Sequence, residues 1–201
     1  MLTQTHIAIG LLVAARRGRR AAITGAILGG MAPDISMVPM MLVSYFLLGQ
    51  GMDQIWSETF YSAPWWTMDQ ITNSAPLYAV LTALGAVLVS RTKHWGPRFL
   101  LAFSLTALLH VGFDFVTHAT DGHIHLWPFS DFIFASPVSY WESAHHGRLF
   151  GFIEAVAGLV AAVVLWRLYR GWVVRTFCGL LALMSVLGLV LSTLLTLGFG
   201  R

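Results

Sequence analysis

Long apolar runs alternate with short polar connections along most of this 201-residue chain. An apolar helix needs about 20 residues to cross the hydrocarbon core of a bilayer. Six runs stand out: the fourth to the sixth reach or approach that length, the first and third are short, and Pro33-Asp34 and Pro39 interrupt the second. They cover about residues 4–15, 21–49, 75–90, 99–118, 149–166 and 176–199. The pattern predicts an all-α integral membrane bundle of about six helices, in which residues 1–201 form a single transmembrane domain. Short or broken helices and an irregular outer loop are expected near any site.

The composition agrees with a membrane protein. Charged residues make up only 10% of the chain, whereas soluble domains carry about 25%. Cys178 is the only cysteine, so an internal disulfide and a cysteine-based zinc site are both excluded. The formal net charge is +3, but no basic face or motif accompanies it, so we expect no nucleic-acid partner.

The positive charges predict an orientation. Ten of the 12 Lys and Arg residues lie in the three connections 16–20, 91–98 and 167–175. These connections fall on one side if each run crosses the membrane once, and such an excess of cations marks the cytoplasmic side. Both termini are then predicted to be extracytoplasmic, together with the loops 50–74 and 119–148.

The fourth run carries ionisable residues, which are costly inside membranes and usually functional there. His110, Asp114 and His118 are each four residues apart, so they share one face of a helix. A carboxylate between two imidazoles suits zinc, manganese or iron. The alternative is a hydrogen-bonded network that only holds helices together.

Further candidates lie outside this run, most of them towards the same predicted outer end; Asp34, in the middle of the second run, is the exception. Asp34 follows Pro33 within an apolar run and is interpreted as a metal ligand or base, or alternatively as a cap for a helix restarting at Ile35. Glu154 is a candidate base. Arg148 is a candidate clamp for a phosphate, with a salt bridge or a lipid head-group contact as the alternative. The remaining candidate metal ligands are imidazoles: His6, His125, His145 and His146.

Four ordered motifs carry a family resemblance. They are Thr5-His6, the segment from Gly29 to Ile35, His110 with Asp114, and the segment from His125 to Ser130. Over about residues 1–155 the chain resembles the LexA-regulated, membrane-bound metal-dependent hydrolases (the YdjM-like proteins), a family thought to be distantly similar to zinc-dependent phospholipases C. Residues 136–141 and 145–147 look closest to a bacterial subgroup, which implies the bacterial inner membrane.

The resemblance has one clear departure. Many members carry His-Arg-x-x-Thr-His-Ser where this chain has residues 69–74, Asp-Gln-Ile-Thr-Asn-Ser. One metal position is therefore lost, or remade with Asp69 or Asn73. His118, His123 and His125 remain alternatives for the ligand that follows Asp114.

Taken together, the residues and the resemblance predict a membrane-bound metal-dependent hydrolase. We expect a divalent metal, Zn²⁺ first, and a phosphoester of a membrane lipid or lipid-linked substrate at the extracytoplasmic interface. Asp34, Glu154 and Arg148 are the expected catalytic residues. The expected metal ligands are His6, Asp34, His110, Asp114 and His118, followed by His125, His145 and His146. The alternatives are a metal-binding transport or sensing protein and a non-catalytic membrane scaffold.

Overall fold

A computed structural model describes residues 1–15 and 19–196, with side chains up to Val190. Within these ranges the chain is all-α, as predicted, and contains no strand. The long helices are α1 (Thr3–Val13), α2 (Arg20–Met31), α6 (Ala75–Arg91), α7 (Trp95–Thr117), α8 (Gly147–Leu168) and α9 (Trp172–Thr196). The shorter α-helices are α3 (Met37–Met41), α4 (Met52–Gln54) and α5 (Trp65–Thr72). Short 3₁₀ or π segments cover Pro33–Ser36, Leu42–Leu47, Ile55–Thr59 and Ser143–His145.

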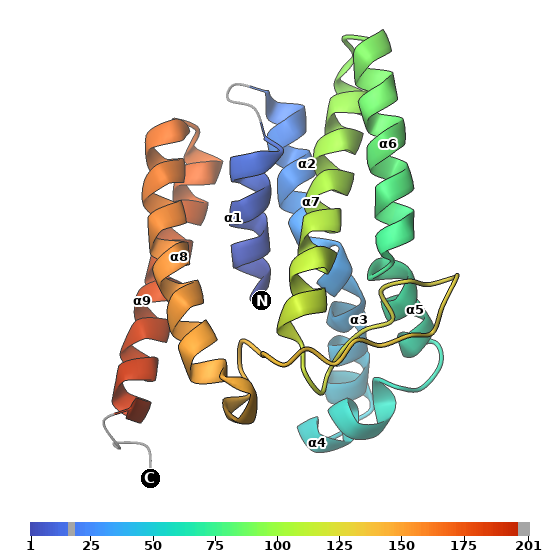
Figure 1. The fold of residues 1–201 in the computed structure, drawn as a ribbon, viewed down its shortest axis with the longest axis vertical. Helices are drawn as coiled ribbons and strands as arrows, with labels where there is room; N and C mark the ends of the chain where they lie inside the picture. The colour runs from blue at the N-terminus through green and yellow to red at the C-terminus, as the bar shows by residue number, and fades with distance from the viewer. Residues whose placement is uncertain (16–18, 197–201) are drawn as a thin grey trace.

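The long helices form an up-and-down bundle (Figure 1). Helices α1, α2 and α7 contact one another at its centre, with α6 against α7 on one flank and the α8–α9 pair against α1 on the other. The short helices α3, α4 and α5 and the long loop before α8 gather at the lower end of Figure 1. Every one of the six predicted apolar runs therefore contains a long helix.

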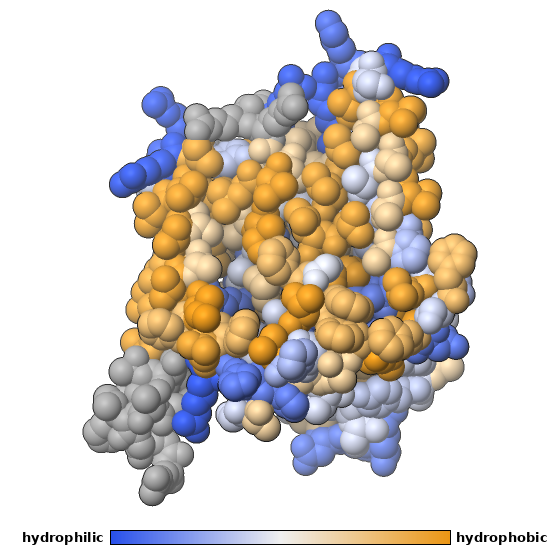
Figure 2. Space-filling view, viewed as in Figure 1, coloured by the Kyte–Doolittle hydropathy of each residue, from blue (hydrophilic) through white to orange (hydrophobic). Residues whose placement is uncertain are grey.

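The helices meet the length requirement for crossing a membrane to different degrees. By length and composition α7, α8 and the described part of α9 are candidate spans. Two bent pairs raise the number to as many as five: α2 with residues 33–47, bent by 55°, and α5 with α6, bent by 41°. Helix α1 has only 11 residues, which is too short to cross alone. Figure 2 shows the expected apolar band around the bundle, with polar residues at both ends.

The described parts of the three basic connections lie at one end of the bundle, uppermost in Figures 1 and 2. This follows from the alternating direction of the long helices and agrees with the prediction that they share a side. Arg16 and Arg17 lie outside the described residues. Which side of the membrane this end faces stays a prediction.

The break after α2 positions a candidate residue. Pro33 lacks an N–H and occupies the first position of a 3₁₀ turn, so regular helix stops at Met31. Asp34 lies in this turn, and its side chain accepts a hydrogen bond from the hydroxyl of Thr3 on α1. The alternative interpretation of Asp34 as a helix cap is wrong, because α3 begins at Met37 and no side chain caps it.

The loop 50–74 is more helical than the pattern of apolar runs predicts. It contains α4 and α5, since apolar and aromatic residues here bury one side of short helices. Helix α5 leads directly into α6, whose first turn is capped by the Ser74 hydroxyl, which accepts from the Leu77 amide at 3.2 Å.

Glycines allow α1, α2 and α7 to approach closely. A Cβ atom on Gly29 would lie 2.1 Å from the carbonyl oxygen of Phe103 on α7, and one on Gly30 would lie 2.8 Å from the Cα of Ile7 on α1. Only a residue without a side chain fits between these backbones. The contact brings the end of α2 against the two helices that carry the candidate imidazoles.

Candidate metal site

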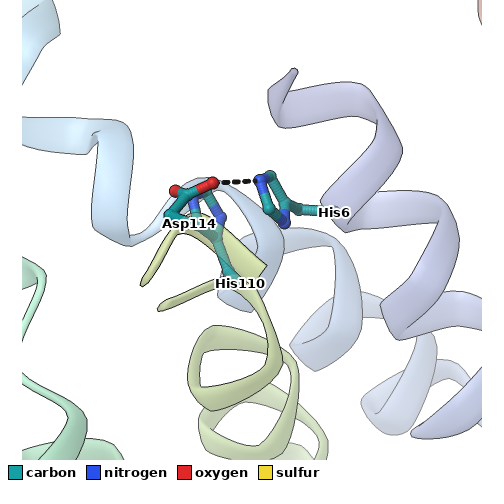
Figure 3. Close-up of side chains that lie close together, drawn as sticks. All are labelled: His6, His110 and Asp114. Carbon is teal, nitrogen blue, oxygen red and sulfur yellow. Dashed lines mark ion pairs between the residues drawn. The ribbon is translucent and has the colours of Figure 1, made fainter. Parts of the chain in front are cut away.

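The centre of the site is a buried carboxylate between two imidazoles. His110 and Asp114 lie one turn apart on α7, as their spacing predicts, and both are buried. The Nε2 atom of His110 lies 2.8 Å from one oxygen of Asp114, and the Nε2 atom of His6 lies 3.0 Å from the other. Figure 3 shows how His6 reaches this carboxylate from the neighbouring helix α1.

The two imidazole rings stack on each other. Their centroids are 3.5 Å apart and their planes differ by 8°, so both rings present an edge to the same side. One ligand atom from each of His6, His110 and Asp114 lies within 4.8 Å of the others. The fold thus converts two distant sequence motifs into one set of three potential metal ligands.

The orientation of His110 is set by α2. Its Nδ1 lies 2.9 Å from the carbonyl oxygen of Gly30. A carbonyl oxygen only accepts, so Nδ1 carries a proton, and Nε2 is the ring nitrogen that faces Asp114. Imidazoles that bind metals are commonly held in this way, by a carbonyl on the nitrogen that does not bind.

The buried atoms that lack hydrogen-bond partners test whether these residues fit a metal ion. His110 Nε2 is buried and makes no hydrogen bond of acceptable geometry within the described residues, although Asp114 is so close. A short nitrogen–oxygen distance without hydrogen-bond geometry is expected of two ligands of one cation. The donor set of two imidazoles and a carboxylate therefore fits a divalent metal.

Two further groups surround this set. Asp34 Oδ1 lies 3.5 Å from His110 Nε2 and its side chain is partly exposed, so it borders the three ligands from the open side. The amino group of Met1 lies 2.8 Å from Asp114 Oδ1. Asp114 is therefore the residue on which the contacts of the site converge.

His118 does not continue the stripe as a helical residue. Helix α7 ends at Thr117, and His118 has extended backbone angles. Its ring lies between two carboxylates, 3.6 Å from Asp114 and 2.9 Å from Asp121. Burial lowers the pKa of His118, but hydrogen bonds to these carboxylates outweigh burial and raise the pKa to about 9. His118 thus links the site to Asp121 rather than joining the closest group.

The sequence did not predict a second His–Asp contact, which joins His123 to Asp69. Asp69 on α5 is fully buried, and its carboxylate accepts from His123 Nδ1 at 2.8 Å and from Asn73 Nδ2 at 3.0 Å. The ring of His123 lies 5.4 Å from that of His118. The spacing of Asp69 and Asn73 could have indicated this cluster, because both residues lie on one face if the segment is helical.

The other predicted imidazoles lie outside the closest group. His125 is buried against Phe115, and burial, with the nearby His123, lowers its pKa to about 4. His145 ends a short 3₁₀ turn, and His146 precedes α8 with a left-handed backbone (φ 63°). Neither has an ion pair or ring contact in the described part of the chain, so the structure does not bring them to the site.

The predicted catalytic residues of the fifth run lie beside the site. Glu154 is buried and accepts a hydrogen bond from the Leu2 amide at 2.7 Å. Arg148 and Glu154 line a cavity of about 450 Å³ between α1, α8 and α9. Asp34, Asp114 and His123 line a second cavity, of about 290 Å³. Tyr140 lines both cavities.

Comparison with known proteins gives one match. Residues 1–196 match the family described as YdjM inner membrane protein, which confirms the resemblance stated from the motifs. No curated protein and no solved structure matches the chain.

Proposed function

The chain belongs to the YdjM inner membrane protein family, and we propose that it is a membrane-embedded, metal-dependent hydrolase of lipid phosphoesters. The observation that carries the proposal is the convergence of three buried potential ligands, His6, His110 and Asp114, with one ligand atom of each within 4.8 Å of the others.

The imidazoles of His6 and His110 would hold the metal, His110 through Nε2, with Asp114 as the carboxylate ligand and Asp34 at the open side. Zn²⁺ is the first candidate because imidazole and carboxylate ligands suit it. Such a metal would lower the pKa of a bound water to about 7 and would polarise a phosphoryl oxygen. Gly30 fixes the tautomer of His110, and Thr3 holds the carboxylate of Asp34.

The cavities beside the site support a lipid substrate. The cavity with Arg148 is also lined by apolar residues, among them Leu2 before α1, Ala155 of α8 and Met184 of α9. An arginine at the polar end of an apolar cavity suits a phosphate that carries acyl chains. Arg148 lies in the first turn of α8, which begins at the end of the bundle opposite the basic connections (Figure 1). The proposed reaction therefore takes place at the extracytoplasmic interface.

Placement of the ionisable groups favours a hydrolase over an ion pathway. Within the described residues, every His and Asp that contacts another lies near the end of the bundle that holds the long loop. A transport path needs polar groups along the full depth of the membrane. The described helices instead become apolar towards the basic end.

Metal content and hydrolysis of the detergent-purified protein test the proposal together. We expect about one tightly bound divalent ion per chain, loss of that ion in Asp114→Asn, and retention in the control Asp131→Asn, whose carboxylate is on the exposed loop. Hydrolysis of a phospholipid in mixed micelles should be lost together with the metal. Metal-free wild-type protein after purification and reconstitution with Zn²⁺, or full activity of Asp114→Asn, would contradict the proposal.

A further inference from the structure

At the end of the bundle opposite the proposed metal site, we propose a binding site for the phosphate of an anionic membrane lipid, formed by Arg19, Arg20 and Arg98. These arginines and Trp95 line a cavity of about 420 Å³ at the N-terminal ends of α2 and α7. The inference does not rest on the proposed hydrolase activity.

The packing of α2 and α7 builds this cavity. Both helices begin at the basic end and run in the same direction (Figure 1). A Cβ atom on Gly25 would lie 2.5 Å from the carbonyl oxygen of Phe99, so the two backbones touch within two turns of their first residues. Two helix N-termini, each with partial positive charge, therefore lie side by side with three guanidinium groups.

The backbone of α2 adds donors to the cavity. No side chain caps the N-terminus of α2, where the preceding residue, Arg19, has extended backbone angles. The first amide groups of a helix have no partner within the helix. Uncapped amides beside arginines provide the donors that bind phosphate in many proteins.

Nothing in the described part of the chain neutralises the three arginines. The connections 91–98 and 167–175 and the residues 14–20 contain no Asp or Glu. Every ion pair among the described residues uses histidine or the amino terminus as its cation. Arg98 donates from its terminal nitrogen to the carbonyl of Lys93, but its Nε is buried without a partner. Within the described residues, no acidic side chain pairs with the arginines that line the cavity.

The position of the cavity selects a lipid as the source of that anion. Figure 2 shows polar residues directly above the apolar band at this end of the bundle, where the head groups of one leaflet lie. Trp95 is 63% exposed beside the arginines, and exposed tryptophans favour this interface. Basic pockets between transmembrane helices bind anionic head groups, and an arginine fork matches a phosphate bidentately.

The experiment compares two pairs of arginines at the same end. Arg20→Gln with Arg98→Gln removes two charges from the cavity, whereas Arg167→Gln with Arg170→Gln removes two charges from the α8–α9 connection, which does not line it. Each variant is purified in neutral detergent. Native mass spectrometry then measures retention of phosphatidylglycerol against phosphatidylcholine with the same acyl chains.

We expect the wild-type protein and the α8–α9 pair to retain about one phosphatidylglycerol in preference to phosphatidylcholine. The cavity pair should retain it at least about tenfold less. Equal loss in both pairs, or no preference for phosphatidylglycerol in wild type, would overturn the proposal. If the cavity pair does not fold, a lipid titration of wild type decides instead, since a bound lipid raises the unfolding temperature. A rise with inorganic phosphate equal to the rise with phosphatidylglycerol would contradict a lipid site.

Discussion

A single methyl group at Gly29 should loosen the metal site without touching a ligand. In the substitution Gly29→Ala the new Cβ atom would lie 2.1 Å from the carbonyl oxygen of Phe103. A carbon and a carbonyl oxygen approach no closer than about 3.3 Å, so α2 and α7 would have to separate by about 1.2 Å. Because the obstacle is backbone, no side-chain rotation relieves the contact.

This separation acts on His110 through the neighbouring glycine. His110 Nδ1 and the Gly30 oxygen are 2.9 Å apart, and a hydrogen bond does not survive a further displacement of about 1 Å. Overpacking of this kind costs about 1–3 kcal/mol. Loss of the hydrogen bond adds about 1 kcal/mol. Removing the group that orients a metal-binding imidazole also weakens metal affinity by about 10–100-fold.

Two measurements on purified protein in detergent check this reasoning: the free energy of unfolding and the affinity for Zn²⁺. Gly112→Ala is the matched control, since Gly112 lies on α7 close to His110 but a Cβ there meets no atom within 4 Å. We expect the control to be neutral or slightly stabilising, as alanine favours helix. If Gly29→Ala unfolds like wild type and binds Zn²⁺ equally well, the close contact between α2 and α7 does not position the site.

Two further predictions concern the loop beside the site. Asp69→Asn removes the charge from a buried carboxylate that accepts hydrogen bonds from both His123 and Asn73. A denaturant titration should show that this substitution destabilises the protein by about 1–3 kcal/mol. The control Asp53→Asn, on an exposed residue, should have no effect. Because burial lowers the pKa of His125 to about 4 from 6.5, the unfolded chain binds a proton before the folded protein does. Wild type should therefore lose about 1–3 kcal/mol relative to His125→Gln as the pH falls from 7 towards 4, and parallel pH profiles of the two proteins would show that His125 is not buried as described.

The parts of the site that lie on one helix were predictable from sequence. His110 and Asp114 share a face because an α-helix repeats every 3.6 residues, and their apolar surroundings made a helix certain. The contribution of His6 was predictable only through the family resemblance. Its place depends on α1 packing against α7, where a Cβ on Gly10 would lie 2.2 Å from the side chain of Thr106. Periodicity within a run carries no information about such pairings between runs.

The contact between Asp69 and His123 was not predicted from the sequence, for a different reason. Helix α5 has only eight residues and is rich in aromatic and polar side chains, so its apolar pattern is too short to distinguish a helix from a loop. Its burial comes from packing against the segment 33–41, more than twenty residues earlier. The structure does not bring His145 and His146 to the site, and the sequence did not indicate this. Two adjacent histidines carry no information about the direction of the helix that follows them.

The helix break at Pro33 positions two of the proposed metal ligands. A helix end leaves its last four carbonyl groups without partners inside the helix, and Gly30 is among the last four residues of α2. In an apolar environment such a carbonyl needs a donor, which His110 Nδ1 supplies. The same break turns Asp34 towards Thr3 and brings it to the open side of His110. In an uninterrupted helix the carbonyl groups would be hydrogen-bonded within the helix, and neither tautomer of His110 would be favoured. The break at Pro33 therefore orients one proposed ligand, His110, and positions another, Asp34.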